Sequence, residues 1–208
     1  MSEQQRQTMI VTGTGNVTGK PDLVTVQLGI TTHSEQLADA QAENTKRSQS
    51  VIDRLSTLGI QDNEIQTLSY TVSPQYDYID GQQRFRNYEV QHQLRVTVKN
   101  ISTVGEVIDA AVQSGATDVS SIQFGIENSS DLYEQALSKA VGNAQAHAQA
   151  LAQAADVVLN LVPVTIQEGV QSEARPFAVQ MAKMSSAPRI EPGTLEIQAT
   201  VTVTYSFR

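Results

Sequence analysis

Three stretches of the chain alternate strictly between apolar and polar residues, at residues 24–31, 90–99 and 195–207. Successive side chains of a β-strand point to opposite faces, so each stretch has one face suited to a core and one suited to water. Strands buried in a parallel sheet read instead as continuous apolar runs. The alternation therefore predicts a mainly antiparallel sheet. Weaker strand patterns lie at residues 9–17, 64–78, 119–126 and 162–167.

Apolar residues at helical spacing predict three helices between these strands, over residues 35–58, 103–114 and 130–156. At the start of the first helix, Thr32 and Glu35 fit a capping box. At its end, Gly59 followed by Ile60 fits a left-handed C-cap with a hydrophobic contact. Strands and helices together predict an α+β fold, in which about three helices pack on one face of the sheet.

Two connections between the predicted elements differ from ordinary short turns. Asp80-Gly81 is a hairpin signal between the third and fourth strands, and we expect a longer loop that continues through Arg86. Residues 171–189 lack clear periodicity and contain two prolines, which predicts a long loop joining two strands. Loops of this length in a compact domain are usually functional or disordered.

Alanine recurs every four residues along the predicted third helix, at positions 136, 140, 144, 148 and 152. Alanine has the highest helix propensity, and a row of small side chains lets a sheet or another helix approach closely. Tight packing within one chain is the favoured interpretation, and a subunit interface is the alternative. Residues four apart drift by about 40° around a helix. We therefore expect one end of the row to pack on the sheet, with the other end free to meet a second subunit.

Charge and cysteine content exclude several classes of function. The 208 residues include 14 Lys and Arg against 22 Asp and Glu, which gives a formal net charge of −8. Such a field repels polyanions, so nucleic acid and anionic membranes are poor partners. The chain has no cysteine, which excludes thiol catalysis, cysteine-based zinc sites and disulfides.

The N-terminal residues 1–8 are polar and lack the apolar core of a signal peptide, so we expect a flexible N-terminus. No stretch of about 20 apolar residues exists, and no membrane insertion is expected. As written, the chain reads as cytoplasmic, or as a periplasmic or envelope protein if a leader was replaced by the start Met. Residues 9–208 are expected to form a single domain.

Catalytic and metal-binding residues are not apparent. The three histidines, His33, His92 and His147, lie on different predicted elements, without the close spacing of a local metal motif. His92 falls on the apolar phase of its strand, where we expect a hydrogen-bonded core histidine. The pair Gly13 and Gly15 lacks the third glycine and the following helix of a dinucleotide-binding loop, and indicates close backbone packing or a bulge in a strand. We therefore expect no catalytic site, no metal and no cofactor.

Aromatic and arginine residues gather around the predicted hairpin, at Tyr76, Tyr78, Arg84, Phe85, Arg86 and Tyr88. Tyrosine and arginine are the residue types that most often anchor protein interfaces. These six residues are therefore the candidate interface for a second subunit or another protein. A platform on which a sugar or nucleotide stacks, and ordinary packing, are the alternatives.

The order and spacing of several short features carry a family resemblance. They are Val11-x-Gly13-x-Gly15 followed by Pro21-Asp22, the helix end Leu58-Gly59-Ile60, Thr67-x-x-Tyr70 with Pro74 and Tyr76 beyond it, Tyr88, the alanine row, and Pro192-Gly193. Together they cover about residues 9–207 and resemble the SIMPL-domain family, which includes periplasmic immunogenic proteins and envelope proteins linked to oxidative-stress resistance. The resemblance implies an α+β fold, a tendency to oligomerise and no established enzymatic activity, and it supplies no catalytic residues.

These observations lead to two competing expectations about function. The first is a non-enzymatic, self-associating protein that binds or scaffolds other macromolecules, with the link to envelope or oxidative-stress physiology that the resemblance implies. The alternative is a small-ligand carrier or enzyme with a pocket between the helices and the sheet. A broad self-complementary surface favours the first, and a deep pocket with convergent polar groups favours the second.

Overall fold

A computed structural model describes residues 7–169, 175–176 and 193–208 of the chain. Their contacts divide the chain into two compact units. The central unit contains Asp22–Gly125, and the terminal unit contains the residues before and after this range. Both units combine helices with an antiparallel sheet, so the predicted α+β fold is confirmed. The alternation of the strands did not reveal that they belong to two sheets. The single domain over residues 9–208 stays a prediction.

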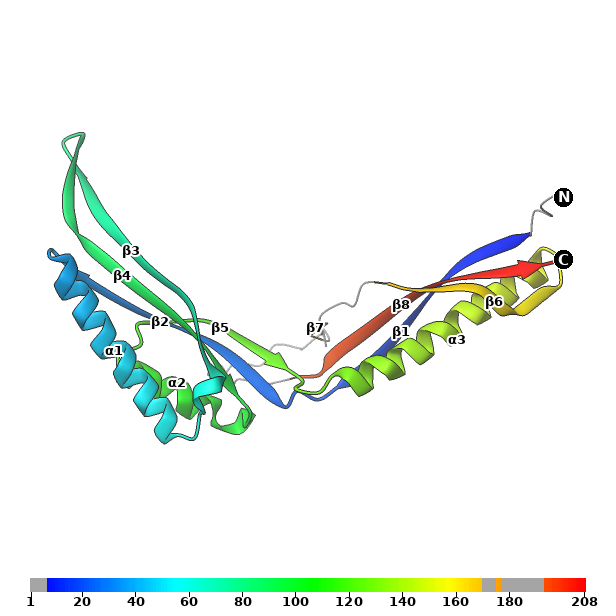
Figure 1. The fold of residues 1–208 in the computed structure, drawn as a ribbon, viewed down its shortest axis with the longest axis horizontal. Helices are drawn as coiled ribbons and strands as arrows, with labels where there is room; N and C mark the ends of the chain where they lie inside the picture. The colour runs from blue at the N-terminus through cyan, green and yellow to red at the C-terminus, as the bar shows by residue number, and fades with distance from the viewer. Residues whose placement is uncertain (1–6, 170–174, 177–192) are drawn as a thin grey trace, which may run out of the picture. The chain divides into compact units, whose positions relative to one another are not determined.

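The central unit is a four-stranded antiparallel sheet in the order β3-β4-β2-β5. Its elements are β2 (Leu23–Ser34), α1 (Leu37–Thr57), the short helix η1 (Asp62–Glu64), β3 (Ile65–Ile79), β4 (Gln82–Val98), η2 (Ile101–Thr103), α2 (Val104–Gln113) and β5 (Asp118–Gly125). One face of β2 and β4 packs against α1 and α2 (Figure 1). Large aliphatic side chains such as Leu28, Val51 and Leu55 fill this core and are fully buried.

The two ends of α1 show one prediction confirmed and one that is wrong. At the C-terminal end Gly59 has φ of 88°, and Ile60 N–H donates to Leu55 O, as in a Schellman motif. The capping box is wrong, because β2 continues through Ser34 and holds Thr32 within the strand. The Thr32 hydroxyl donates instead to Ala40 O across the core, at 2.8 Å.

The hairpin between β3 and β4 is tighter than its sequence suggested. Asp80 and Gly81 have φ of 51° and 76°, as a two-residue turn of the type I′ class requires. That turn matches the twist of the strands, so pairing continues up to Ile79 and Gln82. The predicted loop through Arg86 is therefore wrong, because these residues belong to β4.

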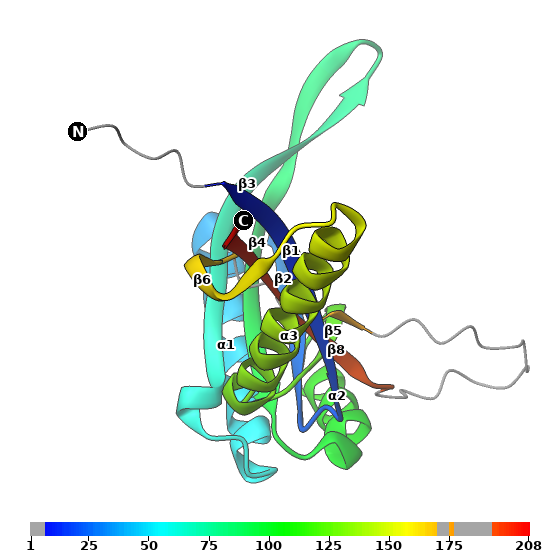
Figure 2. The same cartoon turned by 90° about the vertical axis from the view of Figure 1, so that its right-hand side faces the viewer.

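The terminal unit pairs the two ends of the chain in one sheet, in the order β1-β8-β6, with β7 beside β8. Its elements are β1 (Thr8–Gly19), α3 (Ser130–Ala154), β6 (Leu159–Glu168), β7 (Arg175–Pro176) and β8 (Leu195–Phe207). Helix α3 runs along β1 and β8 (Figures 1 and 2). Of the predicted loop at residues 171–189, Arg175–Pro176 form β7 and pair with β8, and the rest lies outside the described residues.

All five alanines of the row from 136 to 152 are buried, and the first four have no exposed surface. The expectation that one end of the row stays free for a second subunit is therefore wrong. It assumed a flat partner, whereas the paired strands β1 and β8 are twisted and follow the winding row. Packing within the chain, the favoured interpretation, is confirmed.

Candidate interaction surface on the hairpin of strands β3 and β4

The hairpin extends beyond the sheet to which it belongs. Strand β2 pairs with β4 only as far as Ser34, which lies opposite Tyr88. Residues 75–87 therefore continue as a two-stranded ribbon, called here the arm, which extends past the ends of β2 and α1 (Figure 1). A ribbon without a third strand has unpaired edges on both sides and no core of its own.

One face of the arm carries a cluster of aromatic rings. Tyr76 lies directly opposite Phe85, and their ring centroids are 6.0 Å apart in an edge-to-face arrangement. Phe85 contacts Tyr88, with centroids 5.0 Å apart. Tyr78 follows Tyr76 on the same face and is 76% exposed. Tyr76 and Phe85 are also about half exposed, so the described residues cover this aromatic face only in part.

A β-bulge makes this aromatic face possible. Phe85 and Tyr88 are three residues apart, and in a regular strand they would point to opposite faces. Gln75 pairs with Asn87 whereas Tyr76 pairs with Phe85, so Arg86 has no partner in the β3 register. The extra residue restores the phase and places both rings on one face. Sequence alternation alone does not reveal this.

The charged side chains of the arm balance one another. Asp77 and Asp80 are its acidic residues, and Arg84 and Arg86 are its basic residues. Arg86 forms an ion pair with Asp77 at 3.7 Å, and Arg84 lies opposite Asp77 in the strand register. The arm therefore has no net charge, although the whole chain carries −8. All six residues predicted as the candidate interface lie on this arm or at its base.

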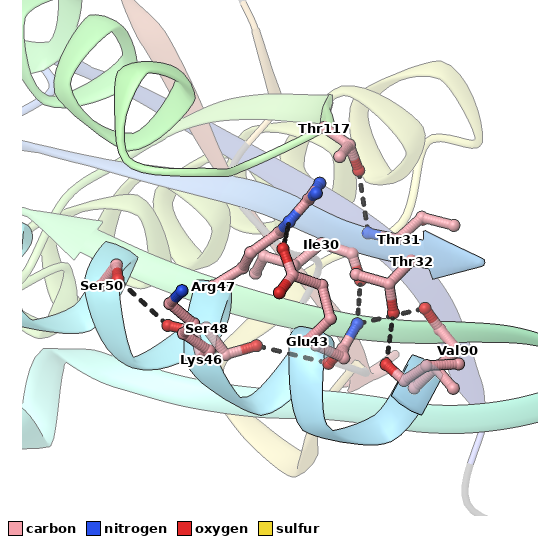
Figure 3. A network of polar contacts seen from close by, with 12 residues as sticks. Ile30, Thr31, Thr32, Glu43, Lys46, Arg47, Ser48, Ser50, Val90 and Thr117 are labelled. Carbon is pink, nitrogen blue, oxygen red and sulfur yellow. Dashed lines mark hydrogen bonds and ion pairs between the residues drawn. The ribbon is translucent and has the colours of Figure 1, made fainter. Parts of the chain in front are cut away.

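Apart from the arm, the central unit has a polar site between α1 and the sheet (Figure 3). Asn44 of α1 is fully buried, and its side-chain amide donates to Ile30 O at 2.8 Å and to Val90 O at 3.1 Å. These carbonyls belong to the neighbouring strands β2 and β4, so one side chain links both strands to the helix. Sequence reasoning missed Asn44, although a polar residue on the apolar stripe of a helix was an available signal.

His92 completes this polar site. The expected hydrogen bonds of its ring are present, but the residue is half-buried, so the expected core position is wrong. Its Nδ1 lies 2.9 Å from Ser48 Oγ, and its Nε2 lies 3.0 Å from Thr67 Oγ1. Burial lowers the pKa of His92 below its ordinary value of 6.5, because the charged ring is harder to solvate there. A neutral ring accepts one hydrogen bond and donates one, which matches its two hydroxyl neighbours.

The other candidate residues take no part in the hydrogen bonds of this polar site. His33 is exposed and lies 3.8 Å from Glu89. His147 is on α3 and contacts Thr12 O of β1 at 3.0 Å. Gly13 and Gly15 pack against the backbone of α3, so the prediction of close backbone packing is confirmed.

The described residues contain no group of three or more His, Asp or Glu side chains that could hold a metal ion. None of the helices in the same ranges is both long and apolar enough to cross a bilayer. A hollow of about 380 Å³ lies between α3 and β1, beside Ile10, His147 and Leu151.

Comparison with known proteins places the chain among relatives of undetermined activity. The sequence profile of the SIMPL family, described as "Protein of unknown function (DUF541)", matches residues 9–205. The 26 kDa periplasmic immunogenic protein of Brucella melitensis is 29% identical over 157 residues, which are 73% of this chain and 63% of that protein. The uncharacterized protein YggE of Escherichia coli K12 is 24% identical over 136 residues, or 65% of this chain and 55% of YggE. The chain thus spans less than two thirds of the length of these relatives.

Proposed function

The chain belongs to the SIMPL family, and we propose that it is a non-enzymatic protein that self-associates through its arm and thereby scaffolds other macromolecules. The observation that carries the proposal is the exposed aromatic face of Tyr76, Tyr78 and Phe85. Aromatic side chains supply much of the binding energy of protein interfaces, because they bury a large area with few rotatable bonds.

The charge of the arm supports a second copy as its partner. Two copies that each carry −8 repel one another at long range. Contact between two neutral segments brings few charges of the same sign together at the interface. Asp77 and Arg86 form an ion pair, so each of these two charges already has a partner. Contact between the arms of two copies would use the same surface patch on each copy, as a two-fold symmetric interface does.

Envelope physiology is the setting we propose for this activity. The Brucella relative is named as a periplasmic protein, and it shares 29% identity with this chain. A periplasmic location for this chain is consistent with the absence of cysteine, since oxidation of thiols then plays no part in its folding.

Light scattering of the purified chain over a range of concentrations tests the proposal. We expect a mass above that of one chain, which falls on dilution. The double variant Tyr76→Ala/Phe85→Ala is expected to dissociate more easily, because each aromatic truncation at an interface centre costs about 2 kcal/mol, or about thirtyfold in the dissociation constant.

The matched control is Val112→Ala, which truncates an exposed apolar side chain on α2 of the same unit. It should leave both mass and dissociation constant unchanged. A parent chain with the mass of one copy at every concentration would contradict self-association. An unchanged dissociation constant in the double variant would show that the arm is not the interface.

A further inference from the structure

Strand β1 lies at the edge of the sheet in the terminal unit. Within the described residues it pairs with β8 alone. In an antiparallel pair every second residue turns its N–H and C=O groups away from the partner strand. In β1 the backbone groups of Thr12, Thr14 and Asn16 turn outward. Side chains of α3 contact backbone atoms of these three residues. Unpaired groups of this kind can pair with a strand from another molecule.

Three side chains of α3 occupy these outward groups. Lys139 Nζ donates to Asn16 O at 3.1 Å. Asn143 Oδ1 accepts the N–H of Thr14 at 3.0 Å. The third side chain is that of His147, whose Nδ1 lies 3.0 Å from the carbonyl oxygen of Thr12. Lys139, Asn143 and His147 are called here the polar row of α3.

The spacing of the helix matches that of the strand. Residues four apart on a helix rise by about 6 Å, and residues two apart on a strand advance by about 6.8 Å. The three α3 residues are four apart, and their partners on β1 are two apart and in reverse order. Consecutive turns of the helix therefore meet consecutive outward residues of the strand.

The glycines of β1 bring the helix close enough for this contact. A Cβ atom at Gly13 would lie 2.1 Å from Ala140 O, and one at Gly15 would lie 2.0 Å from Ala136 O. Because both glycines lack this atom, the helix backbone lies directly on the strand. Short side chains such as that of Asn143 then reach the backbone edge.

The hydrogen bonds of the row are mutually consistent. Asn143 uses its carbonyl oxygen for Thr14, which leaves its NH₂ group to face His147 Nε2 at 3.4 Å. A neutral imidazole with its hydrogen on Nδ1 accepts at Nε2 and donates to Thr12 O. Asn143 thus orients His147.

We infer that the outer edge of β1 is a masked strand-addition site, and that Lys139, Asn143 and His147 are its mask. The occupant that the mask excludes is β1 of a second copy. Antiparallel pairing about Thr14 would place Thr12 opposite Asn16, so the outward donors and acceptors of the two strands match. These three β1 side chains are uncharged, and strand addition would therefore meet no like-charge repulsion along the edge. This inference holds whether or not the arm mediates self-association.

The test uses the full chain and a fluorescent peptide with the sequence of residues 8–19. In the triple variant Lys139→Ala/Asn143→Ala/His147→Ala, alanine preserves helix propensity while removing all three edge contacts. We expect this variant to bind the peptide at least tenfold more tightly than the parent, with a shift to higher mass in light scattering. The control Glu134→Ala/Ser138→Ala/Gln149→Ala changes three exposed residues of the same helix and should behave like the parent. Equal binding by parent and triple variant, whether tight or absent, would overturn the inference.

A single substitution keeps the inference testable if the triple variant does not fold. In Asn143→Ala the amide of Thr14 loses its acceptor, and its hydrogen exchange should accelerate at least tenfold. The amides of Gly13 and Gly15 turn toward β8 and should keep their exchange rates. Unchanged exchange at Thr14, or equal acceleration at all three amides, would mean that Asn143 does not protect the edge.

Discussion

The two units place a helix on an antiparallel sheet in opposite ways. In the terminal unit α3 meets β1 through alanine and glycine, so that backbone lies against backbone at Gly13 and Ala140. In the central unit α1 meets β2 and β4 through large side chains, among them Leu28 and Leu55. The first contact is set by the absence of side-chain atoms, and the second by their presence.

This difference determines which substitutions each unit tolerates at the contact between helix and sheet. A contact between backbones leaves no room for added atoms, but removing a methyl group from it changes little buried area. A contact through Leu and Val buries more apolar area for each residue, and it loses most when atoms are removed. The close contact also lets side chains of α3 reach the edge of β1, whereas the wider one accommodates Asn44 between helix and sheet.

Gly13→Ala should have the largest effect among the substitutions that test this comparison. Its Cβ would lie 2.1 Å from Ala140 O and 2.5 Å from Ala144 N, and backbone atoms cannot move aside as a flexible side chain can. We expect a loss of about 3 to 4 kcal/mol in unfolding free energy, measured by urea denaturation. The control is Gly29→Ala in β2, where the new atom meets only the Asp118 side chain, at 3.2 Å. Similar losses for both glycines would contradict the backbone-contact argument.

Leu55→Ala makes the opposite change to Gly13→Ala, because it removes side-chain atoms from the core of the central unit. Leu55 is fully buried against the sheet, so the substitution leaves a cavity and should cost about 3 kcal/mol. The counterpart in the terminal unit is Ala140→Gly, which should cost about 1 kcal/mol, chiefly through helix propensity. Thermal unfolding of both variants gives the comparison. A larger loss for Ala140→Gly would show that the alanine contact depends on buried methyl groups.

Asn44→Ala tests whether the wider contact depends on its polar link. The substitution leaves Ile30 O and Val90 O without this buried donor, and we expect a loss of about 2 kcal/mol. Thr45→Ala, on the exposed side of α1, should change stability by less than about 0.5 kcal/mol. Equal urea midpoints for the two variants would contradict a stabilising role for Asn44.

Acidification should have the smallest effect, and it should act through His92 in the central unit. Burial lowers the pKa of His92 in the folded chain, so the unfolded chain binds more protons once the pH falls below about 6.5. The contribution to stability is fully present above that pH and is lost as the pH falls from there through the lower pKa of His92 in the folded chain. Urea denaturation at neutral and mildly acidic pH measures the difference. His92→Gln removes this titration, and an equal pH dependence in that variant would assign the effect to other groups.

The sequence predicted much of the fold but little of the candidate surface geometry. Apolar alternation located β2, β4 and β8, because the period of a half-buried strand is visible in its residues. Helix α3 was predicted within about two residues at each end, since its alanine content favours only one conformation. The six candidate interface residues were identified by type alone. The common face of Phe85 and Tyr88 depends on the bulge at Arg86, which strand pairing creates and local sequence does not specify.

Local physics, acting over a few residues, therefore determined the helices and strands of this protein and the left-handed end of α1 at Gly59. Tertiary structure decided what depends on contacts between distant segments. It divided the strands between two sheets, covered the whole alanine row with the twisted pair of β1 and β8, and brought His147 to the edge of β1 across 135 residues of sequence. Residues close in sequence determine the rotamer and backbone preferences of a side chain. Its contact partner depends on which surfaces the whole chain buries together.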